Sequence, residues 1–90
     1  MLVIFGKLSE EVTMFYRAIK RDPNTGQNIP ITEWKAGSEG YNSCCDFIET
    51  IFQSRDIKPF RIVGYDGFPH FMSVRFNMVY YVEHRILTSN

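Results

Sequence analysis

Two adjacent cysteines and two histidines are the residues of this sequence that come closest to a reactive site. Cys44 and Cys45 fall at the start of a predicted helix, where the helix dipole lowers the pKa of a thiol. A nucleophilic cysteine needs a nearby base, so Cys45 with His70 is the candidate catalytic pair, and His84 is the other available base. Asp46 follows directly and opposes a thiolate. The simpler interpretation is that Cys44 is a small core residue and Cys45 lies at the core margin, so we expect no enzyme.

The segment from Asn42 to Phe47 resembles the active-site region of papain-like hydrolases, in which the nucleophile opens a helix packed on a sheet. The resemblance covers these few residues and includes no diagnostic motif, and the papain-like folds are generally larger. It implies a cysteine nucleophile at this helix start and nothing more about the chain.

Metal and cofactor sites are not predicted. Two cysteines and two histidines could in number form a tetrahedral set, but adjacent cysteines lack the usual ligand spacing. The carboxylates are scattered, and the sequence contains neither a glycine-rich phosphate loop nor a serine nucleophile elbow. We therefore expect no bound metal and no cofactor.

Composition predicts a small intracellular protein. The 90 residues are enough for a single domain, residues 1–90, and ten basic residues balance ten acidic ones. A neutral chain has no overall field that attracts phosphate. Neighbouring cysteines do not pair with each other, so we expect a reducing, cytoplasmic location. The apolar run Leu2–Phe5 is too short for a signal peptide or a membrane span.

The first half of the chain predicts strands followed by a helix. Residues 2–8 are expected to form a short buried strand. Residues 9–11 fit a turn into a second strand over residues 12–21, which we favour, or the cap of a helix over residues 9–21 that begins at Ser9. A turn at residues 22–26 returns the chain into a strand over residues 28–35, and Pro30 marks it as an edge. Residues 43–55 then repeat apolar side chains at helical spacing and predict the covering helix.

The last third of the chain predicts one long strand. A strand at residues 60–65 leads to Asp66-Gly67, which is a hairpin signal. The register stays open: a loop of two or four residues puts Val63 on the same face as Met72, and a loop of three or five residues puts Phe60 and Ile62 there. From His70 to Ile86 apolar residues then alternate without a Gly or Pro. Such a strand would span about 50 Å, against a radius of gyration of about 12 Å. Asn77 is its expected bulge.

These elements predict an α+β fold, with a single antiparallel sheet of about five strands, one covering helix and a long C-terminal strand. If residues 9–21 were helical, the fold would become a split two-layer sandwich. The sequence alone does not decide between the two.

The predicted function is binding to another protein. The excess length of the last strand invites pairing across an edge, and two such strands could join around a two-fold axis. We therefore expect an inhibitor-type or accessory protein, of the kind that viruses and mobile elements encode, which acts as a homodimer and has no membrane contact. The candidate contacts lie on the mixed face of the long strand: Phe71, Arg75, Tyr81 and Arg85.

Single-stranded nucleic acid is the alternative partner. Aromatic side chains beside arginines on a sheet form a stacking platform for bases. The candidates are Arg17, Lys20, Arg21, Arg61 and Tyr65. A hairpin with an Asp-Pro turn followed by a helix resembles AP2-type and integrase-arm DNA-binding domains, which are usually more basic than this chain.

Overall fold

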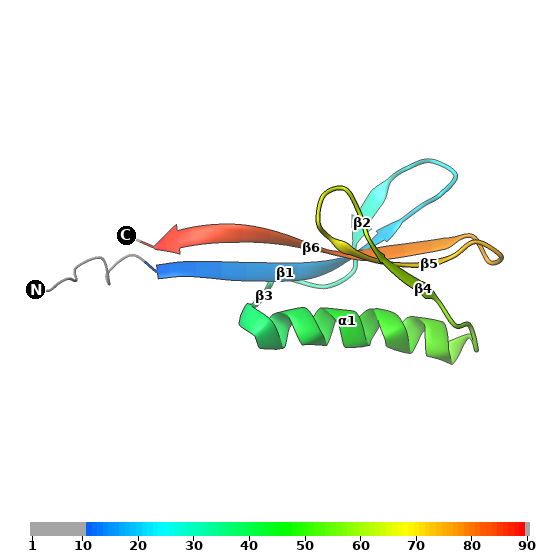
Figure 1. The fold of residues 1–90 in the computed structure, drawn as a ribbon, viewed down its shortest axis with the longest axis horizontal. Helices are drawn as coiled ribbons and strands as arrows, with labels where there is room; N and C mark the ends of the chain where they lie inside the picture. Colours follow the sequence, from blue (N-terminus) through cyan, green and yellow to red (C-terminus); the bar gives the residue numbers. More distant parts are fainter. Residues whose placement is uncertain (1–10, 90) are drawn as a thin grey trace, which may run out of the picture.

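The fold is a six-stranded antiparallel sheet with one helix on one face. It is seen in a computed structural model that describes residues 11–89 (Figure 1). The predicted strand at residues 2–8 lies outside the described residues. The elements are β1 (Glu11–Arg21), β2 (Asn28–Pro30), β3 (Lys35–Ala36), α1 (Gly37–Ser54), β4 (Phe60–Val63), β5 (Pro69–Ser73) and β6 (Met78–Ser89). The predicted α+β class is confirmed.

The centre of the sheet is the pair formed by β1 and β6. The strand order is β2-β1-β6-β5-β4, and β3 also pairs with β1. The β1–β6 ladder runs without interruption from Glu11 opposite Ser89 to Arg21 opposite Val79. Residues 11–21 are therefore a strand, and the alternative helix over residues 9–21 is wrong. Their β-branched and aromatic side chains favour a strand, and β6 supplies the partner.

The helix begins earlier than the sequence predicts. It starts at Gly37 instead of near Ser43. Gly40 explains the difference, because a Cβ atom at this position would lie 2.4 Å from the carbonyl oxygen of Lys35. Because glycine has no Cβ atom, the first turn of the helix can lie directly against β3.

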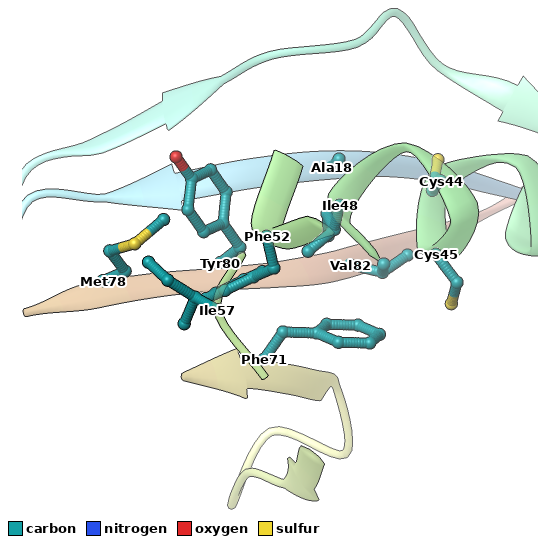
Figure 2. Close-up of a cluster of buried hydrophobic side chains, with 10 residues drawn as sticks. All are labelled: Ala18, Cys44, Cys45, Ile48, Phe52, Ile57, Phe71, Met78, Tyr80 and Val82. Carbon is teal, nitrogen blue, oxygen red and sulfur yellow. The ribbon is translucent and has the colours of Figure 1, made fainter. Parts of the chain in front are cut away.

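The core lies between α1 and one face of the sheet (Figure 2). From the helix, Cys44, Ile48 and Phe52 point inward and are fully buried. Side chains from three strands of the sheet pack against them, and Ile57 joins the core from the segment after the helix. The buried cluster consists of Ala18, Cys44, Cys45, Ile48, Phe52, Ile57, Phe71, Met78, Tyr80 and Val82.

The predicted strand over residues 70–86 is two strands. A turn at residues 74–77 separates β5 from β6, and Asn77 has φ +55. Asn77 adopts the left-handed geometry that its residue type tolerates, but the residue closes a hairpin turn and does not form the expected bulge. The alternation misled because Val74 and Phe76 continue the apolar pattern into the turn, where they are 76% and 49% exposed.

The predicted strand over residues 28–35 is also interrupted. Only Asn28–Pro30 and Lys35–Ala36 pair with β1, and β2 ends the strand order, as Pro30 indicated. Between them the Thr32 hydroxyl accepts a hydrogen bond from the amide of Ala18 at 2.9 Å. The hydroxyl replaces a backbone acceptor, so the segment can separate from β1 while the Ala18 amide keeps a hydrogen-bond partner.

The strand pairing fixes the β4–β5 register that the sequence leaves open, and the turn between the two strands has the expected chemistry. Phe60 lies opposite Met72, which is the register expected for a loop of three or five residues. Within the loop, Asp66 accepts a hydrogen bond from the amide of Phe68, and Gly67 has φ +81. Both residues therefore act as turn formers.

The turn at Asn77 generates the first prediction. Asn77→Ala should lower the free energy of unfolding by about 1 kcal/mol, because alanine is strained at positive φ. Asn77→Gly should leave it nearly unchanged, since glycine adopts this geometry freely. Urea denaturation followed by circular dichroism measures both variants. An equal loss of stability in the two would contradict this account of the turn.

Candidate functional site

The outer side of β6, the edge strand β4 and the uncovered face of the sheet are surfaces on which a partner could bind. The helix covers only the face that carries Ala18, Phe71, Tyr80 and Val82, and we call the other side the open face. Pairing fixes which side chains share it: Ile62, His70, Tyr81 and Ile19 form one row across four strands. Phe60, Met72, Val79 and Arg21 form the row beside it.

The middle of the open face is closed by its own side chains. Tyr81 is only 6% exposed, because His70 stacks on its ring at 4.9 Å and Phe68 stacks on it at 5.9 Å. The Arg21 guanidinium lies 5.2 Å from the same ring. A stack that is already complete offers no vacant face to a ligand base or side chain.

A second cluster of the open face surrounds the tryptophan. The guanidinium groups of Arg17 and Arg85 lie 4.4 Å and 5.0 Å from the ring of Trp34. Arg17 also forms an ion pair with Glu83, directly opposite on β6. These contacts hold the β2–β3 segment against the sheet, so Trp34 contributes to packing here.

The first edge is formed by the long ribbon of β1 and β6. β5 pairs with β6 only from Met78 to Tyr81, so within the described residues β6 has no strand on its outer side from Val82 to Ser89. The ends of both strands extend beyond the start of α1 (Figure 1). We call this part the arm: Glu11–Met14 of β1 with Ile86–Ser89 of β6.

The second edge is β4, which is apolar and exposed. β4 ends the strand order, and all of its residues are exposed: Phe60 is 64% exposed, Ile62 50% and Val63 71%. Beside it, the open face has a hollow of about 570 Å³ lined by Ile62, Met72 and Val79, with Tyr65 at its margin. Natural edge strands usually carry charges or proline; in β4 the only charge is Arg61.

The four predicted contact residues do not share one face. The hairpin turn makes odd residues of β5 pair with even residues of β6, so Phe71 lies opposite Tyr80 and His70 lies opposite Tyr81. Phe71 is buried in the core at 1% exposure, and Arg75 is exposed in the turn. Arg85 is exposed on the open face. The predicted common face is wrong because the continuous strand that defined it is broken.

The five residues of the nucleic-acid alternative are also dispersed. Arg17 and Arg21 lie on the open face, where Glu83 and Asn28 are their hydrogen-bond partners. Lys20 and Arg61 belong to the opposite side, since they lie opposite Tyr80 and Phe71. Tyr65 is fully exposed in the β4–β5 loop. Binding of a single strand through these residues stays a prediction, but they do not form one platform.

Cys45 and His70 are separated by the sheet. Cys45 packs in the core on the helix side, whereas His70 lies on the open face with Nδ1 2.9 Å from the carbonyl oxygen of Phe68. The earlier helix start also moves Cys45 away from the N-terminus. Burial raises the pKa of its thiol above the ordinary value of 9.0, although Tyr41 and Arg61 act in the other direction. The two side chains therefore do not form a nucleophile and its base.

Comparison of the chain with known protein families, with curated proteins and with solved structures gave no match. Among residues 11–89, no group of three or more histidine, cysteine or carboxylate side chains could hold a metal ion. The helix in this part of the chain lacks the apolar length of a membrane span.

Sequence reasoning missed the apolar edge formed by Phe60, Ile62 and Val63. It identified a strand over residues 60–65 but assigned it no role. The signal was the scarcity of charge in this strand, yet an edge strand and a central strand can have the same composition. Only the strand order shows that, within residues 11–89, no further strand lies on the outer side of β4.

Burial of the cysteines generates the second prediction. In the folded protein, Cys44 and Cys45 should react with iodoacetamide at neutral pH slower than in urea by about tenfold or more, because thiolate fraction and exposure set the rate. Mass spectrometry of timed, quenched samples measures both. If Cys45 instead reacted faster when folded than when unfolded, it would be an activated nucleophile.

Proposed function

We propose that this protein is a protein-binding module that acts as a homodimer, and that the outer edge of β6 forms the dimer interface. The observation that carries the proposal is that, among residues 11–89, no strand pairs with the outer side of β6 from Val82 to Ser89. A row of free backbone N–H and C=O groups is a template for another strand. In this role the protein acts as an inhibitor-type or accessory protein. The proposal includes a reducing, cytoplasmic location because Cys44 and Cys45 are both free.

The shape of the molecule supports a partner at the arm. Its radius of gyration is 16.3 Å and its long axis is 58 Å, whereas a compact chain of this length has a radius of about 12 Å. Two strands alone are marginally stable in water. The arm also lacks a connecting turn, because its ends are the start of β1 and the end of β6. A second copy would turn this ribbon into a four-stranded sheet.

Symmetry restricts how two β6 edges can pair. A two-fold axis perpendicular to the sheet pairs the two β6 strands antiparallel and puts the helix side of both copies on the same side of the joined sheet. Odd-numbered residues then lie opposite odd-numbered residues, and even-numbered opposite even-numbered. Centring the axis on Arg85 would bring two like charges together, which is unfavourable. Centring it on Ile86, which is 57% exposed, places this side chain against its own copy. In that register the bodies lie at opposite ends and β5 of each copy stays clear of the interface, while the ring of Phe68 in the preceding loop packs against His84 at its inner end.

The third prediction concerns Ile86. Ile86→Lys should weaken self-association by about tenfold or more, because it sets two ammonium groups against each other at the axis. Sedimentation equilibrium over a concentration series measures the dissociation constant, and circular dichroism checks that the variant folds.

Val74→Lys is the matched control, since Val74 is an exposed apolar residue outside the arm. It should leave the dissociation constant unchanged. A wild-type protein that stays monomeric at every concentration would refute the dimer, and equal effects of both variants would place the interface elsewhere.

A further inference from the structure

The edge strand β4 combines exposed apolar side chains with one oriented charge. Phe60 and Ile62 lie on the open face, and Arg61 lies on the helix side. Val63, on the helix side of the same strand, and Tyr65, in the loop after it, are exposed as well. Exposed apolar side chains that gather at one edge often mark an interaction site.

Arg61 is held in place and forms no ion pair with any residue that the structure describes. Its guanidinium lies 5.0 Å from the ring centre of Phe71 and donates a hydrogen bond to the Tyr41 hydroxyl at 3.1 Å. Within the described part of the chain, no carboxylate forms an ion pair with Arg61, and the ion pair found there joins Arg17 and Glu83. Glu49 and Asp56 line the same pocket as Arg61, but neither forms an ion pair with it, so the guanidinium held at this edge can still pair with a carboxylate from outside.

We propose that β4 binds an extended segment of another protein in which an acidic residue stands between two apolar ones. The segment would add a strand to the free edge through backbone hydrogen bonds. Its apolar side chains would contact Phe60 and Ile62 on the open face. Its carboxylate would lie on the helix side, beside Arg61.

A second copy of this chain fits the edge less well. If two copies paired their β4 strands around a two-fold axis, the axis could pass beside Arg61 or beside Ile62. The first register opposes two arginines, and the second opposes Arg61 to the partner's Val63. Neither supplies a carboxylate, so charge complementarity favours an acidic segment of a different protein.

This inference goes beyond the proposed function, because it uses β4 and not β6. Binding at β4 therefore requires no dimer, and Ile86→Lys should not affect it. Either interface can fail while the other stands.

The test is a titration of the full-length, isotope-labelled protein with a blocked peptide of sequence Thr-Val-Glu-Val-Thr, followed by NMR. The amide signals of Phe60–Val63 should shift most. A peptide with lysine in place of glutamate should bind about threefold or more weakly, which is the range of an exposed charge pair.

Charge reversal supplies the decisive control. Arg61→Glu should invert the preference, so that the lysine peptide binds more tightly than the glutamate peptide. Arg75→Glu, which reverses an exposed charge in the turn at residues 74–77, should leave the preference unchanged. The unaltered spectrum of residues outside β4 verifies the fold of each variant.

Three outcomes would overturn the proposal. Shifts that are absent, or that concentrate on the arm, would show that β4 is not the binding edge. Equal affinity of the wild type for both peptides would remove the role of Arg61. Signal broadening without peptide that Ile62→Lys abolishes would show that a second copy occupies the edge.

Discussion

The antiparallel ladder between β1 and β6 supports the rest of the described chain. β2 and β3 attach to one side of it, β5 attaches to the other, and α1 packs across it on Ala18 and Val82. The helix has 18 residues and is about 27 Å long, with a diameter of about 10 Å. Neighbouring strands are about 4.8 Å apart, so one helix covers the width of roughly two strands. The arm therefore lies beyond its reach, and β4 contacts the helix through Arg61, which donates a hydrogen bond to Tyr41.

This limit explains why the two sides of the sheet are stabilised differently. The helix side is a packed apolar core, in which Phe52 and Phe71 are almost completely buried. On the open face, flat polar and aromatic groups do the covering: His70 on Tyr81, and Arg17 on Trp34. Such pairs protect area locally but do not extend to the sheet edges. Apolar residues at those edges stay exposed, and both proposed interfaces begin there.

The two edges differ in what they offer a partner. The arm presents mainly backbone from β6, with Ile86 as an exposed apolar side chain, and pairing by symmetry suits it. β4 is short and carries an oriented guanidinium between apolar residues, which selects for charge as well as for extended shape. A protein with both edges could assemble with itself and still hold another chain. Its neutral net charge leaves neither interface dominated by long-range attraction.

Local chemistry alone determined much of this architecture. The Asp22–Gly26 turn, with Gly26 at φ +76, and the apolar side of the helix follow from neighbours a few residues apart, and so were predictable. Only the tertiary structure decided where the long C-terminal pattern breaks, because Val74 and Phe76 keep the alternation through an exposed turn. It also decided that Cys45 and His70 lie on opposite sides and that β4 is an edge. Strand order and facing depend on contacts between distant segments, and residue type and spacing within a segment do not encode them.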